Sequence, residues 1–180
     1  CHFRPDLIDF DRSHFEAYGR VNHRFAQSLM PLLRADDIVW IHDYQLIPLA
    51  RELRAQGARQ RIGFFLHIPF PPPDLFEALP GHDTVLRWLF DYDLVGFQTE
   101  PDRQHFHDCI RRIAGGRSQG PYVHAFGSRL LTGVFPIGID AEHVRSLSQS
   151  SDGAREFRRM RSSLRGRAQI ISVDRLDYSK

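Results

Sequence analysis

The sequence contains few cysteines and almost no lysine. Its two cysteines, Cys1 and Cys109, have no regular spacing, which argues against a disulfide framework and against a structural zinc site. This usage suits a reducing compartment, so we expect the protein to be cytoplasmic. The only lysine is Lys180. Coding bias explains why every other basic residue is arginine, although arginine also suits phosphate recognition.

The chain also lacks a long apolar run and a strong net charge. No run approaches the roughly 18 apolar residues that span a bilayer, and no charged-then-apolar leader opens the sequence. Lysines and arginines number 24 and aspartates and glutamates 22, which leaves a net charge of +2. So small an excess does not imply binding to nucleic acid or to an anionic membrane, and we expect neither as a partner.

Strand-like and helix-like segments alternate along most of the chain. Strands are predicted over 37–42, 61–66, 93–98, 122–126 and 130–137, and helices over 14–35, 45–56, 74–79, 83–90 and 100–114. The first helix is expected to begin after an N-cap at Ser13 and to bury Val21 and Phe25. The alternation predicts an α/β fold whose centre is a parallel sheet.

The character of the sequence changes near residue 140. Residues 141–168 are charged, serine-rich and compatible with helices, and 169–173 have the composition of a buried strand. We therefore predict a domain over 1–140, whose start is missing, and over 141–180 linker helices and the first strand of a second α/β domain. The chain begins with Cys1 and stops in a charged run at Lys180, so we expect a piece of a longer protein.

Two of the predicted strands end in ionisable residues, Asp43 and His67. Ligands of open parallel sheets bind at the carboxyl ends of the strands, so both residues are candidates for chemistry. Asp43 is interpreted either as a helix N-cap or loop carboxylate, or as a group that binds a sugar hydroxyl or acts as a base. His67 is interpreted either as a satisfied structural histidine, or as a hydroxyl donor and proton shuttle held by the prolines after it.

Two cations, Arg175 and Lys180, follow the strand predicted over 169–173. A diphosphate needs charge neutralisation, which an arginine fork and a lysine point charge supply. A solvated turn, in which Asp174 or Asp177 pairs with Arg175, explains the same residues.

No metal site is predicted. His105 and His107 are two residues apart on a predicted helix and so face different ways, which argues against a shared metal. The sequence has no glycine-rich phosphate loop of standard spacing and no Gly-x-Ser-x-Gly nucleophile motif. Trp40 and Trp88 lie in apolar periodic segments, so both are predicted to be in the core.

Five segments of the chain together resemble a known family. They are VWIHDYQL (39–46), RIGFFLHIPFP (61–71), DYDLVGFQT (91–99), PIGID (136–140) and SVDRLDYSK (172–180). In order and spacing they are similar to the motifs of the trehalose-6-phosphate synthase family. The chain departs from the family's pattern at Gln45, where a second histidine is common, and at Pro72 and Asp74 in the loop after His67.

The resemblance implies a retaining glycosyltransferase of the GT-B type, in which two Rossmann-like domains face a cleft. Such an enzyme transfers glucose from UDP-glucose, or another NDP-glucose, to glucose 6-phosphate and forms α,α-trehalose 6-phosphate. UDP-glucose and glucose 6-phosphate are then the partners, and the full-length protein is expected to be a homo-oligomer. No cofactor is required by this chemistry, and Mg²⁺ is expected to act as a stimulant at most.

The resemblance also implies roles for individual residues. Asp43 binds the acceptor sugar and His67 contacts the donor glucose, and these two are the implied catalytic residues. Arg175 and Lys180 bind the donor diphosphate, and Ile68 matches a position linked to anomer selectivity. In the implied front-face mechanism the leaving phosphate oxygen takes the acceptor proton, so no protein nucleophile is needed.

Two alternatives remain open beside this function. Glucosylglycerol-phosphate synthase and related pseudo-glycosyltransferases share the five motifs, and a non-catalytic regulatory domain that binds sugar phosphates is an alternative of another class. The family's N-terminal glycine loop, its phosphate-binding arginine and most of its nucleotide domain have no counterpart in these residues. We therefore expect the chain by itself to be inactive.

Overall fold

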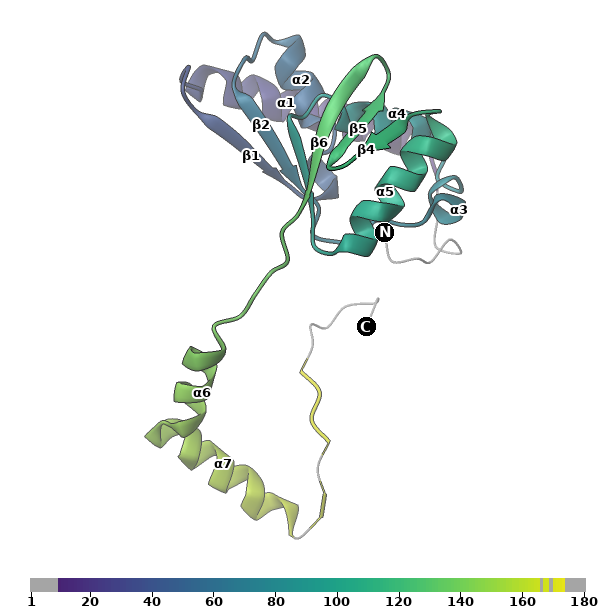
Figure 1. Ribbon diagram of the computed structural model, residues 1–180. Helices are drawn as coiled ribbons and strands as arrows, with labels where there is room; N and C mark the ends of the chain where they lie inside the picture. The colour runs from purple at the N-terminus through teal and green to yellow at the C-terminus, as the bar shows by residue number, and fades with distance from the viewer. Residues whose placement is uncertain (1–9, 166, 169, 174–180) are drawn as a thin grey trace. The chain divides into compact units, whose positions relative to one another are not determined.

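The computed structural model describes residues 10–165, 167–168 and 170–173 and is drawn in Figure 1. The chain forms two compact units, Cys1–Pro136 and Ile137–Lys180. The first contains helices α1 (Arg12–Leu29), α2 (Leu49–Ala55), α3 (Pro73–Phe76), α4 (His82–Leu89) and α5 (Glu100–Ile113), the 3-10 turns η2 (Met30–Leu32) and η3 (Tyr44–Leu46), and strands β1 (Ile38–His42), β2 (Arg61–Phe65), β3 (Leu94–Phe97), β4 (Arg117–Gln119), β5 (Tyr122–Ala125) and β6 (Ser128–Val134). The domain division predicted at residue 140 stays a prediction.

The strands form one sheet in the order β1-β2-β3-β6-β5-β4. β1, β2, β3 and β6 are parallel, and β5 and β4 complete the sheet as antiparallel strands. Helices connect the parallel strands, which confirms the predicted α/β class. β4 was missed, because its three polar residues lie between glycines and carry no strand pattern. Its partner β5 turns into β6 through Phe126 and Gly127, which both have positive φ, as a tight hairpin of this twist requires.

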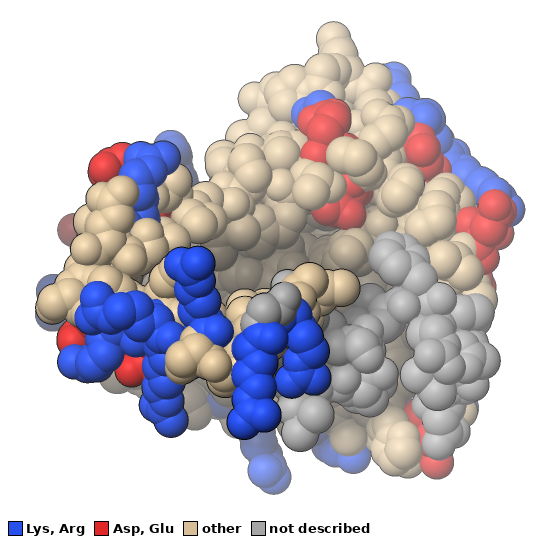
Figure 2. Space-filling model, turned by 90° about the horizontal axis from the view of Figure 1, so that it is seen from below, with Lys and Arg blue, Asp and Glu red and all other residues tan. Residues whose placement is uncertain are grey.

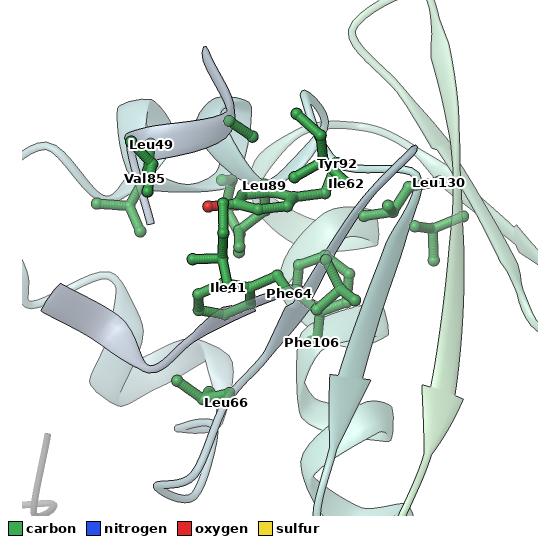
Figure 3. Packing of buried hydrophobic residues seen from close by; sticks show 14 of the residues in the cluster. Ile41, Leu49, Ile62, Phe64, Leu66, Val85, Leu89, Tyr92, Phe106 and Leu130 are labelled. Carbon is green, nitrogen blue, oxygen red and sulfur yellow. The ribbon is translucent and has the colours of Figure 1, made fainter. Parts of the chain in front are cut away.

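The hydrophobic core lies between one face of the sheet and the helices. Alternate strand residues such as Ile41, Ile62 and Phe64 point into it, where they belong to one buried cluster with Leu89 and Phe106 from the helices. Figure 3 shows these side chains converging from strands and helices. β1 buries alternate residues only, whereas β2 and β3 bury residues of both faces.

The other face of β1 is open, although the strand carries apolar residues on both faces. Val39 and Ile41 are buried, whereas Ile38 is 72% and Trp40 is 45% exposed. Among the described strands β1 is at the edge of the sheet, where it pairs with β2. The prediction that Trp40 is a core residue was wrong, because its side chain lies on the face opposite to Val39 and Ile41. Trp88 is half-buried and stacks on Phe15 at 5.3 Å between ring centroids.

Helix α1 begins earlier and buries other residues than its sequence predicted. The N-cap is Asp11, whose carboxylate accepts a hydrogen bond from the Ser13 N–H at 2.7 Å. Its fully buried residues are Asn22 and Ala26. Val21 and Phe25 are about half exposed, because the small Ala26 and the polar Asn22 allow the closest approach to the rest of the fold.

Aromatic rings lie against glycines on the open face of the sheet. A Cβ on Gly63 would stand 2.3 Å from the Trp40 ring of the neighbouring strand, and a Cβ on Gly96 would stand 2.8 Å from the Phe65 ring. Phe135 lies in the same way against Gly133, at 2.6 Å from its ideal Cβ. The glycines are needed here because any side chain would occupy the volume that the rings fill.

The second unit contains the helices α6 (Ala141–Gln149) and α7 (Ser151–Leu164). Their N-caps are Asp140 and Ser150, which accept hydrogen bonds from His143 N and Gly153 N. The arginines of α7 are exposed, and Figure 2 shows arginines gathered on the side seen from below. Asp152 and Glu156 on the same helix form ion pairs with two of them, as on a solvated helix face.

The strand predicted over 169–173 is absent from the part of this range that the structure describes. Residues 170–173 form no strand, and Ile170 and Val173 are 99% and 92% exposed. A strand needs a partner for its backbone hydrogen bonds, and the described part of the chain supplies none for these residues. The composition of a buried strand was therefore an insufficient signal.

We predict that Gly63→Ala destabilises the full-length protein that contains this chain by about 1 to 3 kcal/mol, because the new methyl group displaces the Trp40 ring. Urea unfolding measures the change. Gly19→Ala is the matched control, since nothing lies within 4 Å of its Cβ. That helical substitution is expected to stabilise by up to about 1 kcal/mol. Equal effects of the two substitutions would contradict the packing described.

Candidate active site

Asp43 stands at the carboxyl end of β1 with a strained backbone. Its φ of 68° and ψ of 165° fall in a region that is essentially reserved for glycine, where other residues carry a cost of about 1 to 3 kcal/mol. Such strain persists only where the surrounding structure enforces it, and it concentrates at functional sites. No pattern in the sequence indicated this conformation.

Hydrogen bonds to the residues after Asp43 enforce that conformation. The Tyr18 hydroxyl donates to the Tyr44 carbonyl, and the Asn22 amide donates to the Gln45 carbonyl at 3.1 Å. The Tyr92 hydroxyl donates to the carbonyls of Leu46 and Ile47 at 2.8 and 3.0 Å. Four consecutive carbonyls are thereby held by side chains from α1 and from the segment before β3. Burial raises the pKa of both tyrosines, so their hydroxyls remain donors.

The carboxylate of Asp43 has one oxygen engaged. Its backbone N–H donates to the Phe65 carbonyl at 2.8 Å, which continues the pairing of β1 with β2. Oδ1 accepts a hydrogen bond from the Tyr44 N–H at 3.0 Å, so Asp43 is the N-cap of η3, as one of its two interpretations stated. Among the described residues no hydrogen bond reaches Oδ2. The N-cap role therefore leaves one carboxylate oxygen for a ligand.

His67 lies beside this carboxyl end and contacts a second histidine. Its Nε2 is 2.9 Å from Nδ1 of His42, the last residue of β1. Both imidazoles are exposed, and their ring centroids are 5.1 Å apart. The structure thus brings Asp43 and His67 to the same edge of the sheet, and it adds His42, to which the sequence gave no separate role.

The loop after His67, which contains Pro69 and Pro71–Pro73 and is called the proline loop below, is held in place by residues of α5. The Asp102 carboxylate accepts a hydrogen bond from the Phe70 N–H at 3.1 Å, and His105 Nδ1 donates to the Phe70 carbonyl at 2.9 Å. Thr99 caps α5 and donates to Asp102 at 2.6 Å. The residues after His67 have no regular structure until Pro73 begins α3, as predicted. Sequence reasoning missed Asp102, because an acidic residue in the first turn of a helix is a common capping signal.

Ile68 points into an apolar cavity. The cavity has a volume of about 610 Å³, and its lining includes Phe15 and Tyr18 of α1, Tyr44 of η3, Phe76 of α3, and Leu66. Ile68 is partly buried against the core. Because Ile68 directly follows His67, a substitution at Ile68 is expected to change the packing of the segment that carries His67.

A second cavity lies at the amino ends of the strands. It has a volume of about 660 Å³, and its lining includes Arg54, Arg61, Asp93 and Arg129. Arg54 is already engaged, since it pairs with Asp93 at 2.9 Å and donates to the carbonyls of Ala58 and Gln60. None of the predicted site residues lines this cavity, and ligands of parallel sheets bind at the opposite end. The carboxyl end is therefore the candidate site.

The remaining predictions concern the two cations near the C-terminus and the histidines of α5. Arg175 and Lys180 lie outside the described residues. His105 and His107 face different partners, as predicted, because His107 Nε2 is 2.8 Å from Thr132 Oγ1 in the core. Burial lowers the pKa of His107. Within the described ranges no group of three or more His, Cys, Asp or Glu could hold a metal, and no helix is long and apolar enough to cross a membrane.

Known proteins with the same arrangement identify the family. A profile of glycosyltransferase family 20 matches residues 1–180. The chain belongs to glycosyltransferase family 20. Among curated members, the trehalose-6-phosphate synthase of Citrobacter koseri is 47% identical over 182 residues, and that of Escherichia coli K12 is 46% identical over 180 residues. Each alignment covers 99% of this chain but only 38% of the relative, so the chain spans well under half the length of these family members.

Solved structures of the family share the fold. The α,α-trehalose-phosphate synthase (UDP-forming) of Burkholderia xenovorans, in complex with glucose-6-phosphate, is 47% identical with a TM-score of 0.92, over 98% of this chain and 40% of that one. An E. coli structure bound with UDP-2-fluoro glucose is 44% identical with a TM-score of 0.89, over 98% of this chain and 39% of that one. The expected Rossmann-like architecture of a GT-B family is thereby confirmed.

We predict that glycine is tolerated better than alanine at Asp43, because glycine releases the backbone strain. Both substitutions remove the cap, so the same pair at Asp140 serves as control, an N-cap with an ordinary φ of −76°. The stability advantage of glycine over alanine is expected to be larger at Asp43 than at Asp140 by about 1 to 3 kcal/mol. Urea unfolding of the full-length variants measures both differences, and equal differences would mean that Asp43 is not strained.

Proposed function

We propose that the full-length protein containing this chain transfers glucose from UDP-glucose to glucose 6-phosphate with retention of configuration. The products are α,α-trehalose 6-phosphate and UDP. The enzyme is then an α,α-trehalose-phosphate synthase of the UDP-forming type. The chain alone lacks more than half of the length of its relatives, and we propose that it is inactive without the rest.

The observation that carries this proposal is the strained Asp43 next to His67 at the carboxyl end of the parallel sheet. The strained backbone of Asp43 places a carboxylate with one engaged oxygen at this end of the sheet. The other oxygen suits the recognition of a sugar hydroxyl, because a carboxylate oxygen is a strong acceptor. Two related structures support the assignment of the substrates, since one is in complex with glucose-6-phosphate and another is bound with UDP-2-fluoro glucose.

We assign complementary roles to the two sides of the site. Asp43 accepts hydrogen bonds from the acceptor sugar, and His67 contacts the donor glucose. Arg175 and Lys180 neutralise the diphosphate, whose negative charge grows as the bond from phosphate oxygen to glucose breaks. The phosphate oxygen then takes the proton of the attacking hydroxyl on the same face of the sugar. Ile68 supports selectivity between anomers through the loop that carries His67.

This mechanism needs no nucleophile from the protein. Cys109 is the one described cysteine, and burial raises the pKa of its thiol to about 12, which makes it unreactive. We propose that no cofactor is required, that Mg²⁺ is at most a stimulant, and that the full-length protein is a cytoplasmic homo-oligomer. Neither nucleic acid nor membrane is proposed as a partner.

We expect the full-length protein to release UDP from UDP-glucose only when glucose 6-phosphate is present. A coupled assay for UDP, with product analysis for a non-reducing phosphorylated disaccharide, tests this. Glycerol 3-phosphate is the matched alternative acceptor. Activity with glycerol 3-phosphate alone would favour the glucosylglycerol-phosphate synthases, and binding of sugar phosphates without turnover would favour a regulatory domain.

We expect Arg175→Ala in the full-length protein to weaken the binding of UDP strongly. A charge-assisted hydrogen bond contributes about 1.5 to 3 kcal/mol, which corresponds to a Kd raised by roughly 10- to 150-fold. Calorimetric titration with UDP gives the change directly. Arg158→Ala, on the exposed surface of α7, is the control and should leave the Kd unchanged. An unchanged Kd for Arg175→Ala would remove this residue from the site.

A further inference from the structure

The contact between His42 and His67 is the strongest feature of the site that the proposed function does not use. His42 Nδ1 and His67 Nε2 are 2.9 Å apart, which is the distance of a good N–H···N hydrogen bond. Each neutral imidazole has one N–H donor and one acceptor nitrogen. In this bond one ring therefore donates and the other accepts, and the choice fixes the tautomers of both.

The sheet itself holds the two rings in this contact. His42 is paired in register with Phe65, and His67 follows Phe65 by two residues, so both side chains lie on the open face. Trp40 packs edge-on against His42 at 5.7 Å, and Phe65 packs edge-on against His67 at 4.9 Å between ring centroids. The rings of Trp40 and Phe65 are in turn seated on Gly63 and Gly96.

Among the described residues no hydrogen bond reaches Nδ1 of His67, which leaves this nitrogen for a ligand. Imidazole by itself favours the tautomer with its proton on Nε2. If His67 Nε2–H donates to His42 Nδ1, both rings adopt this favoured form, whereas the opposite direction would place both protons on Nδ1. The favoured arrangement makes His67 Nδ1 an acceptor, because the hydrogen bond at one ring nitrogen determines the protonation of the other.

We propose that His42 is a positioning residue that holds His67 in one tautomer and one orientation, so that His67 Nδ1 accepts a hydrogen bond from a hydroxyl group of the donor sugar. This inference rests on the proposed function for the identity of the ligand. The hydrogen bond itself does not depend on that function. His42 need not touch either substrate, because its effect is exerted through the ring of His67.

Substitutions at His42 separate positioning from bulk. Asparagine places its amide at the position of the imidazole Nδ1 and can accept from His67, whereas glutamine places its amide at the position of Nε2, and leucine has no polar atom. For the full-length protein we expect His42→Leu and His42→Gln to lower kcat/KM for UDP-glucose about five- to tenfold, the usual effect of one lost hydrogen bond. His42→Asn should retain most of the wild-type kcat/KM for UDP-glucose. KM for glucose 6-phosphate should not change.

A double-mutant cycle tests whether His42 acts through His67. In a His67→Ala background, His42→Leu should cause no further loss, because the partner of the hydrogen bond is already absent. His124→Leu, on β5 of the same sheet, is the matched control and should leave all kinetic constants unchanged. The proposal would be overturned if His42→Asn and His42→Leu lowered kcat/KM for UDP-glucose equally. It would also be overturned if the fold-decreases of the two single variants multiplied in the double variant.

The nitrogen resonances of the His67 ring give a readout that needs no turnover. In full-length protein labelled with ¹⁵N-histidine, His67 should show a protonated Nε2 and an unprotonated Nδ1, assigned by their loss in His67→Gln. Both resonances should move in His42→Leu. If the His67 resonances were the same in His42→Leu as in the wild type, the hydrogen bond would be refuted. If the wild-type protein showed the expected resonances but released no UDP, only the proposed function would be refuted.

Discussion

The hydrogen bonds to the four carbonyls after Asp43 are the constraint on which the candidate site depends. Tyr18, Asn22 and Tyr92 hold these carbonyls, and they come from segments far apart in the sequence. Together they fix η3 and thereby the strained turn at Asp43. An aspartate keeps a conformation suited to glycine only because the cost of this strain is smaller than the cost of leaving buried hydroxyl, amide and carbonyl groups without partners.

The open face of the sheet holds the two histidines of the site, and it does so by packing. Glycines on β2, β3 and β6 remove side chains where aromatic rings of neighbouring residues need volume. Trp40 and Phe65 can then lie against Gly63 and Gly96 and pack edge-on against His42 and His67. Hydrogen bonds fix the turn that carries the carboxylate, and packing fixes the imidazoles. Both groups come to the same sheet edge because parallel strands end together.

The proline loop links the site to α5. Proline removes backbone donors, so the loop cannot join the sheet, and it needs anchoring by other groups. Asp102 and His105 provide the anchors through the two backbone groups of Phe70. The loop that carries His67 and Ile68 is thus bounded by a strand at one end and by a helix along its length. This arrangement lets a segment without regular structure hold a functional residue in place.

The sequence by itself determined the α/β class, most strand and helix positions, and the two strand ends that carry Asp43 and His67, because periodicity and β-propensity are local properties of the chain. Five ordered motifs also determined the family, and the family profile confirms it. Only the tertiary structure revealed the open face of β1, the exposed residues 170–173, the positive φ of Asp43 and the contact of His42 with His67. These depend on which groups a strand or a turn finds as neighbours, and residues as distant as Tyr18 and Tyr92 become neighbours only when the chain is folded.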